Sequence, residues 1–298
     1  MLFIDCEFVD NQEIIELSAW NLHGEEVYHK FYKPTEIKEW PTSMAIHHIT
    51  PQDVAKSPSF SRSLPEIQKL FDDASYIIGF ATSGDINHLK AAGVKRLDEK
   101  HIIDVRDMYW LFIGQQAGKD YYSLPGLARC AEELGIEFGD KGAHSASEDT
   151  LVTLKCFEAL CDHIEGNPYA DRTPEGFRRA MDIYMTQFHE AKEEYERKRA
   201  MGWIIVTLLP DNLYKVQFKR AEPEDSPELV AKVKVADITR AESDLHVKLQ
   251  RRQVMGRRGI YRLNKADIRA IRSYSNSFGN SEEHDLSRKL LKLQKQWP

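Results

Sequence analysis

The sequence contains no apolar run long enough to cross a membrane and nothing that resembles a secretory leader. A membrane-spanning helix needs about 20 consecutive apolar residues, and no stretch of this chain approaches that length. Met1-Leu2 leads directly into a strand-like run rather than into the charged and apolar segments of a signal peptide. These absences predict a cytoplasmic protein.

Cysteine is scarce, and its four copies are not paired in the sequence. The spacings between Cys6, Cys130, Cys156 and Cys161 do not match the paired cysteines of a metal site. The pattern fits reduced thiols, which are typical of cytosolic proteins. The chain also lacks internal repeats and low-complexity tracts, so a repeat architecture is not indicated.

Neither sign of charge dominates the whole chain, but its two halves differ. Residues 1–170 carry 15 Lys and Arg against 28 Asp and Glu, a balance of −13, and residues 171–200 carry 7 of each. Residues 201–298 carry 19 against 12, a balance of +7, which brings the total to −6. An acidic first half and a basic second half suggest separate tasks, with the basic part a candidate for binding a polyanion. A solvated surface with a chance skew is the alternative.

Strand-like and helix-like segments alternate in the first half. After the first strand we expect two more strands, at 13–20 and 26–32, in an antiparallel meander. The expected helices begin near Pro51, Phe60, Gly84, Val105, Ser123 and Ser145, and further strands are expected at 75–80 and 102–104. This order predicts an α/β fold, a mixed sheet with helices on its faces.

The second half has a different character. Gly166-Asn167-Pro168 breaks the chain, and residues 173–201 are typical of one long charged helix. Expected strands follow at 203–209, 213–218, 229–235 and 247–249, and expected helices at 265–274 and 286–296. We therefore predict a first domain at 1–165, a helical connector at 166–201 and a smaller α+β domain at 202–298.

Asp5 and Glu7 end the apolar run that begins at Met1. Side chains alternate between the faces of a strand, so both carboxylates point to one side and Cys6 points to the other. Two like charges held this close destabilise a strand unless a cation lies between them. The pair predicts half of a metal site, although a solvent-facing strand edge explains it when it is taken alone.

Two further carboxylates lie where a site on a sheet would need them. Asp85 follows an expected strand and turn, at the carboxyl end where open α/β sheets bind their ligands. Asp149 lies in the first turns of an expected helix for which Ser145 and Glu148 match a capping box. This places His144 just before the cap, so His144 and Asp149 can reach the same site.

Four carboxylates in one place repel one another unless cations compensate their charge. Oxygen ligands suit Mg²⁺ or Mn²⁺, and two ions would balance the charge. Two such ions about 4 Å apart clamp the attacking and leaving oxygens of a phosphodiester. A histidine beside them can take the proton from the attacking water.

These segments resemble the motifs of the DEDDh (DnaQ-like) 3′–5′ exonucleases, a family of the ribonuclease-H-like superfamily. The matching segments are 5–8 for the first motif, 77–89 for the second and 144–149 for the third in its histidine form. Segment 46–50 is similar to one that the family uses near the 3′ end of its substrate. The resemblance covers residues 1 to about 163, with the motifs in order. It implies a ribonuclease-H-like fold.

The resemblance also implies a role for each matching residue. Asp5 would bridge two metal ions, Glu7 and Asp149 would complete the shell of one, and Asp85 would support the other through water. His144 would be the general base. Three residues would contact the substrate: Phe8, His47 and Ile49.

The chain departs from the family pattern around the second motif. Phe80-Ala81 stands where the family commonly has His-Asn, and Gly84 replaces an aromatic residue before the metal ligand. These departures put the neighbouring substrate contacts in doubt but leave Asp85 intact. Asp104 is either a fifth ligand or the cap of the helix that follows it.

The implied activity is metal-dependent removal of nucleoside 5′-monophosphates from 3′-hydroxyl ends, with single-stranded DNA favoured as substrate. The alternatives are an exoribonuclease, an endonuclease and a non-catalytic nucleic-acid-binding module. In the second half, a basic and aromatic set is similar to single-strand-binding surfaces, and a solvated face is its alternative. The set comprises Lys248, Arg251, Arg252, Arg257, Arg258, Arg262, Arg269, Arg272, Tyr261 and Tyr274.

Overall fold

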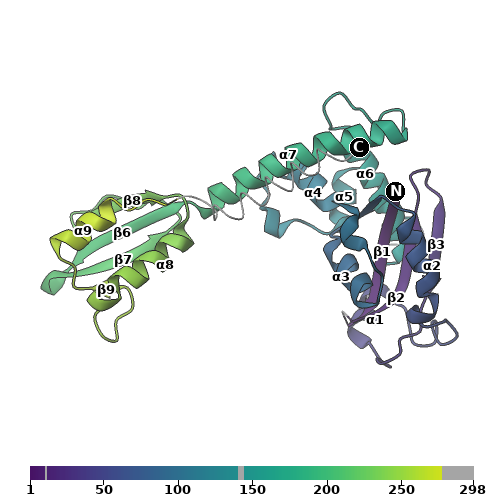
Figure 1. The fold of residues 1–298 in the computed structure, drawn as a ribbon, viewed down its shortest axis with the longest axis horizontal. Helices are drawn as coiled ribbons and strands as arrows, with labels where there is room; N and C mark the ends of the chain where they lie inside the picture. Colours follow the sequence, from purple (N-terminus) through teal and green to yellow (C-terminus); the bar gives the residue numbers. More distant parts are fainter. Residues whose placement is uncertain (11, 140–143, 277–298) are drawn as a thin grey trace. The chain divides into compact units, whose positions relative to one another are not determined.

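The computed structural model describes residues 1–10, 12–139 and 144–276, and the chain forms two compact units. The first unit runs from Met1 to His189, and the second begins at Glu190 (Figure 1). The long helix α7 (Pro174–Ala200) contributes residues to both units. Within the described ranges, no helix is long and apolar enough to cross a membrane.

The first unit is built on a mixed sheet of five strands in the order β3-β2-β1-β4-β5. The strands are β1 (Leu2–Val9), β2 (Glu13–Trp20), β3 (Glu26–Phe31), β4 (Tyr76–Gly79) and β5 (His101–Asp104). The first three form the expected antiparallel meander, and β4 and β5 run parallel to β1. The predicted α/β fold class is confirmed.

Helices cover both faces of this sheet. They are α1 (Pro41–His47), α2 (Phe60–Asp72), α3 (Ser83–Ala91), α4 (Val105–Tyr109), α5 (Leu127–Glu133) and α6 (Ala146–Cys161). On one face, Ile4 and Cys6 of β1 join a core with Phe71 of α2 and Leu89 of α3. On the other face, the Phe3 ring lies 5.3 Å from the Phe157 ring of α6. Alternation along β1 therefore directs its odd-numbered side chains toward α6.

Several helix boundaries differ from the predictions. Residues 51–56 form turns instead of the expected helix. Thr50 and Asp53 do make the reciprocal hydrogen bonds of a helix start, since the Thr50 N–H donates to the Asp53 carboxylate at 2.8 Å and the Asp53 N–H donates to the Thr50 hydroxyl at 3.3 Å. Proline starts α1 at Pro41 instead. The helix expected from Ser123 begins at Leu127, and the one expected from Val105 changes to a π turn at Trp110–Gly114. Short 3₁₀ turns lie at Leu97–Glu99, Tyr121–Ser123, Pro210–Asn212 and Gln250–Arg252.

The described part of the second unit has an antiparallel sheet in the order β8-β6-β7-β9, with helices packed on it. Its elements are β6 (Gly202–Leu209), β7 (Leu213–Lys219), β8 (Leu229–Val235), α8 (Ile238–Leu249), β9 (Ile260–Tyr261) and α9 (Lys265–Arg272). The predicted smaller α+β domain is confirmed. The strand predicted at 247–249 is wrong, because Ala241, Leu245 and Leu249 are buried at helical spacing. The helix predicted at 286–296 lies outside the described residues.

Candidate active site

The first two carboxylates of the site lie on the α6 side of strand β1. Asp5 is paired with Ser18 of β2, and Glu7 is paired with Glu16. Paired residues share a face of the sheet, so Asp5, Glu7 and Glu16 all point toward α6. Both Asp5 and Glu7 are half-buried. Cys6 points to the opposite face and is 5% exposed.

Helix α6 brings Asp149 and His144 to the same side of the sheet. The Asp149 carboxylate oxygens accept the backbone N–H of His144 at 3.2 and 3.3 Å. His144 has φ = 73°, a left-handed conformation that is costly for a residue with a side chain. The hydrogen bond to Asp149 compensates part of this cost and holds the two residues together.

The predicted capping box of α6 is wrong in its hydrogen bonds, although Ser145 does occupy the N-cap position. The Ser145 side chain makes no capping hydrogen bond. The Glu148 carboxylate accepts the backbone N–H of Gly139 at 2.5 Å instead. Glu148 therefore anchors the preceding loop.

Three of the predicted residues form a compact set of possible metal ligands. One ligand atom each from Glu7, His144 and Asp149 lies within 4.8 Å of the other two. Glu7 comes from β1, whereas His144 and Asp149 come from the start of α6. The cluster exists only because α6 packs against β1 and β2.

Asp85 and Asp5 complete the group of carboxylates. Asp85 is the third residue of α3 and is 6% exposed, and hydrogen bonding from the Cys6 backbone reaches its carboxylate. The charges of Asp85, Asp149 and Glu7 all raise the pKa of Asp5. Asp5 therefore lies within electrostatic reach of the other three carboxylates.

The pKa values of these carboxyl groups are all raised, because burial disfavours their ionised forms by more than the protein's hydrogen bonds and charges favour them. Burial is the largest cause, and it raises the pKa of Glu7 to about 8, that of Asp85 to about 7 and that of Asp149 to about 6. Burial and the neighbouring carboxylates raise the pKa of Asp5 well above its usual range. Among the described residues, no cationic side chain is one of the main causes that shift the pKa of Asp5 or Glu7. This donor set fits a divalent cation, which would favour the ionised carboxylates.

Glu16 is a further carboxylate of the site that the sequence reasoning missed. It is 1% exposed, and its Oε1 lies 2.7 Å from Nε2 of His29 on β3. Its Oε2 accepts the backbone N–H of Ala146, the first residue of α6, at 3.1 Å. A signal was present in the sequence, since Glu16 interrupts the apolar segment 14–17 of an expected strand.

A hollow of about 370 Å³ lies beside these residues. Two of the predicted substrate contacts, His47 and Ile49, line it together with His144. Nδ1 of His47 accepts the backbone N–H of Ile49 at 3.0 Å, which ties the two residues to each other. The other lining residues are Glu16, Phe31, His48, Asp53 and Ser145.

Phe8 and Asp104 lie elsewhere. The Phe8 ring lies against His88 of α3, with ring centroids 4.2 Å apart and ring planes inclined by 34°, and Phe8 does not line the hollow. Asp104 is the N-cap of α4, because its side chain accepts the N–H of Arg106 at 3.0 Å. It also accepts the N–H groups of Ala81 and Thr82, at 2.9 and 3.1 Å. Asp104 therefore holds the loop that departs from the family pattern, as a cap and not as a fifth ligand.

A sheet that gathers several carboxylates and a histidine is typical of enzymes that hydrolyse phosphodiesters. The sequence model of the family described as Exonuclease (RNase_T) matches residues 2–157. This match covers 156 of the 298 residues, so the chain belongs to the exonuclease family. The predicted family membership is confirmed, and the first unit carries a hydrolytic nuclease domain.

Comparison with solved structures finds matches at low identity and low TM-score. "Exonuclease X in complex with 5′ overhanging duplex DNA" is 18% identical with a TM-score of 0.40, and covers 54% of this chain and 90% of that one. A full-length 3′-exonuclease is 18% identical with a TM-score of 0.40, covering 52% and 78%. A 3′-exonuclease recognising a histone mRNA stem-loop is 17% identical with a TM-score of 0.41, covering 55% and 81%. No curated protein matches the chain.

Proposed function

We propose that this protein is a metal-dependent 3′–5′ exonuclease that releases nucleoside 5′-monophosphates from 3′-hydroxyl ends. The observation that carries the proposal is the convergence of Glu7, His144 and Asp149 within 4.8 Å, with Asp5 and Asp85 in electrostatic reach. These residues lie inside the part of the chain that matches the exonuclease family. A nucleic-acid-binding module without catalysis would have no need to gather four carboxylates whose pKa values are raised by burial.

Mg²⁺ or Mn²⁺ fits these oxygen donors, and two ions would match their charge. In this proposal Asp5, Glu7, Asp85 and Asp149 would hold the ions. Such ions polarise the phosphodiester and make water more acidic when they are bound.

The residues of the chain perform the remaining tasks. The His144 imidazole accepts the proton of the attacking water, and Asp149 keeps His144 in place through the backbone N–H. His47 and Ile49 seat the 3′-terminal nucleotide in the hollow, whose volume of about 370 Å³ falls in the range of small-ligand sites. Phe8 is proposed to contact the nucleic acid from its position beside His88.

Single-stranded DNA is the proposed substrate, and a 3′–5′ exoribonuclease is the second candidate. A direct test uses matched 5′-labelled DNA and RNA strands, single and duplex, with Mg²⁺, with Mn²⁺ and with chelator. We expect mononucleotide release with metal, no release with chelator, and a block by a 3′-phosphate. Cleavage of a circular strand would show an endonuclease instead.

The site assignment has its own test. Asp5→Asn and His144→Ala are expected to reduce turnover by at least about 100-fold. Asp98→Asn is the matched control, because Asp98 is 84% exposed and pairs only at the surface with Lys90. Unimpaired turnover in Asp5→Asn would overturn the assignment.

A further inference from the structure

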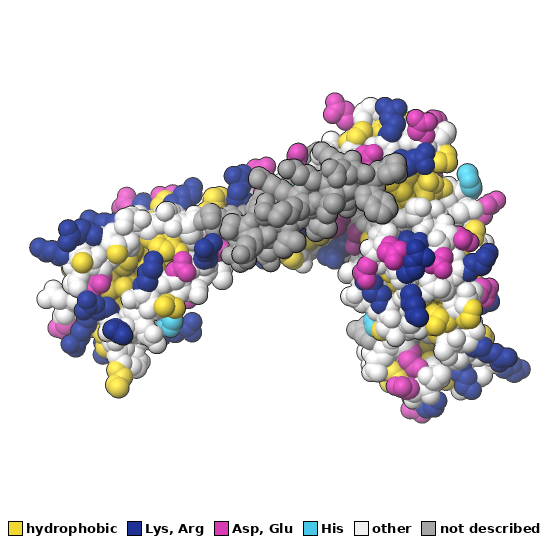
Figure 2. Space-filling view, viewed as in Figure 1, with side chains coloured by type: hydrophobic (Ala, Val, Ile, Leu, Met, Phe, Trp, Pro, Cys, Tyr) yellow, Lys and Arg dark blue, Asp and Glu magenta, His cyan; other side chains and the backbone are white. Residues whose placement is uncertain are grey.

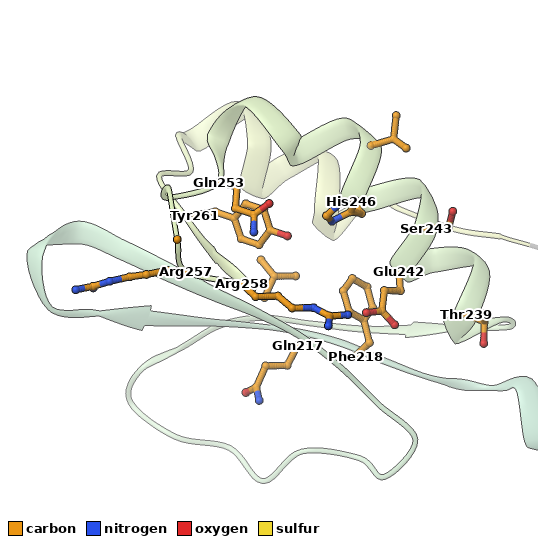
Figure 3. Close-up of a pocket in the computed structure, with 14 residues that line it drawn as sticks. Gln217, Phe218, Thr239, Glu242, Ser243, His246, Gln253, Arg257, Arg258 and Tyr261 are labelled. Atoms are coloured by element: carbon orange, nitrogen blue, oxygen red, sulfur yellow. The ribbon is translucent and has the colours of Figure 1, made fainter.

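Helices α8 and α9 pack on one face of the sheet of the second unit, and among the described residues no helix packs on the other face. Ile204 and Val206 of β6 and Val216 of β7 belong to the core that α8 and α9 complete. Neighbouring residues alternate to the other face. Figure 3 shows this directly, since Phe218 points toward α8 and Gln217 points to the opposite side of the sheet.

Strand register determines which side chains share the open face. Trp203 of β6 is paired with Lys219 of β7 on one side and with Lys234 of β8 on the other. Ile205 is paired in the same way with Gln217 and Lys232, and Thr207 is paired with Lys215. We call this set the lysine face: Trp203, Ile205, Thr207, Lys215, Gln217, Lys219, Lys232 and Lys234.

The lysine face combines positive charge with an aromatic ring and contains no carboxylate. Nζ of Lys232 lies 5.7 Å from the centroid of the Trp203 ring, and Nζ of Lys234 lies 5.9 Å from it. The ring is half-buried, so part of it is accessible. Lysines around an aromatic ring are the elements of a surface that binds single strands.

The loop 220–228, between β7 and β8, lies against this face. We call it the acidic loop, because it carries Glu222, Glu224, Asp225 and Glu228. Nζ of Lys232 pairs with Glu222 and with Asp225, both at 3.1 Å. A hollow of about 370 Å³ is lined by sheet residues of the lysine face and by the loop segment 221–226.

The ion pairs that hold the acidic loop are exposed. The side chain of Glu222 is 59% exposed and that of Asp225 is 84% exposed. Exposed ion pairs contribute little to stability and are screened by salt. The backbone bonds Leu208 N–H to Glu228 C=O and Leu229 N–H to Ser226 C=O anchor only the end of the loop. A competing polyanion can therefore displace its acidic part.

In the basic and aromatic set expected from the sequence, the Tyr261 ring is buried and the Tyr274 ring is half-buried. Tyr261 is 5% exposed and belongs to the core, and the Tyr274 hydroxyl donates to Asp244 at 2.7 Å. The hollow of about 1110 Å³ on that side is lined by Arg257, Arg258 and the opposing Glu242 (Figure 3). Lys and Arg side chains are spread over the visible face of the second unit, with apolar side chains between them (Figure 2). Tyr261 is too buried to stack on a base, whereas Nζ of Lys248 lies 5.4 Å from the centroid of the half-buried Tyr274 ring. Binding by this set stays a prediction.

We propose that the lysine face binds the sugar-phosphate backbone of single-stranded nucleic acid, and that the acidic loop covers this face until nucleic acid displaces it. The choice of nucleic acid as the polyanion rests on the proposed nuclease function. The loop carboxylates occupy positions that phosphates take in the bound state. Each phosphate that pairs with a lysine releases counterions condensed on the nucleic acid, so the affinity falls as the salt concentration rises.

The first experiment measures anisotropy of a 5′-labelled single-stranded 20-mer, as DNA and as RNA, with the full chain in chelator. We expect K219Q/K234Q to weaken binding at least about 10-fold and to flatten its salt dependence. K219R/K234R keeps the charge and is expected to bind like the wild type. K248Q/K265Q is the matched control on the helix side, because it makes the same charge change on α8 and α9. An unchanged Kd in K219Q/K234Q, or a larger loss in K248Q/K265Q, would overturn the proposal.

The second experiment tests whether the acidic loop covers the lysine face. E222Q/D225N is expected to tighten binding at least about 5-fold, because it removes both partners of Lys232. The control D211N/E242Q makes the same charge change at two exposed sites outside the loop. Equal tightening in both variants would show a bulk charge effect and refute the covering role of the loop.

Nuclease assays on a trinucleotide separate this proposal from the proposed function. We expect the wild-type chain to cut the trinucleotide with Mg²⁺ and to leave it intact in chelator, and this result tests the proposed function without the lysine face. Absence of cleavage in every variant, with the binding differences intact, would refute the nuclease function and keep the binding face. Cleavage of the trinucleotide together with unchanged binding in K219Q/K234Q would support the nuclease function and refute the binding face.

Discussion

The carboxylate of Glu16 accepts the backbone N–H of Ala146 at 3.1 Å, across 130 positions of sequence. The contact joins strand β2 to the first residue of helix α6, which carries Asp149 three residues later. The other oxygen of Glu16 lies 2.7 Å from His29 on β3. Glu16 thus connects two strands of the meander to the helix that completes the site.

Glu16→Ala is expected to lower kcat about 10- to 100-fold and to weaken metal binding by a similar factor, because the start of α6 loses its anchor. Glu16→Gln keeps an acceptor for the Ala146 N–H and should lose less. Metal affinity is read by calorimetry and kcat from initial rates. The control is Glu25→Ala in the exposed turn between β2 and β3. A loss confined to KM would contradict the positioning role.

His144 combines a proposed proton acceptor with a strained backbone. Both His144→Ala and His144→Gly should lower turnover about 100- to 10,000-fold through loss of the base. Glycine accepts φ = 73° without the cost of a β-carbon, so His144→Gly should be about 1 kcal/mol more stable than His144→Ala. Thermal melts measure the difference. Added imidazole should restore part of the activity of His144→Gly, and a failure to do so would count against the proton-accepting role.

The carboxylate cluster predicts an unusual dependence of stability on pH in chelator. The pKa of Glu7 is raised to about 8, that of Asp85 to about 7 and that of Asp149 to about 6. A raised pKa in the folded state means that protonation stabilises the fold, fully at low pH and progressively less as pH rises through these values. We expect the Tm in chelator to fall between about pH 5 and about pH 9. Metal requires ionised ligands, so added Mg²⁺ should raise Tm more at pH 8 than at pH 5.

Asp85→Asn should raise the stability of the fold in chelator and lower the activity. It removes a buried charge whose pKa is raised to about 7, so the variant in chelator at pH 8 should melt at least about 3 °C above the wild type. The same change should weaken metal binding and lower turnover at least about 100-fold. Asp98→Asn, at an exposed position, should change neither quantity. A lower Tm for Asp85→Asn would show that the carboxylate stabilises the fold instead.

Local patterns in the sequence predicted most of the strands and helices of the first unit. The alternation of Asp5, Cys6 and Glu7 indicated their faces correctly, because strand alternation depends only on neighbouring residues. The cap at Ser145 was located, but its hydrogen bonds were not, since Glu148 finds a partner in a loop nine residues earlier. The segment Val247-Lys248-Leu249 predicts a strand wrongly, because an apolar-polar-apolar triplet is too short to distinguish the period of a strand from that of a helix.

The sequence by itself determined the family, the mixed α/β sheet and the positions of the carboxylates, because these follow from motifs and short periodic patterns. Only the tertiary structure decided that Glu16 anchors α6, since that contact needs the packing of a helix on strands 130 residues away. It also decided that Trp203, Lys219 and Lys234 share one open face, because strand register brings distant residues into one row. A charge count over residues 202–298 adds the lysines of that face to the carboxylates of the acidic loop, so it does not show that the two lie against each other.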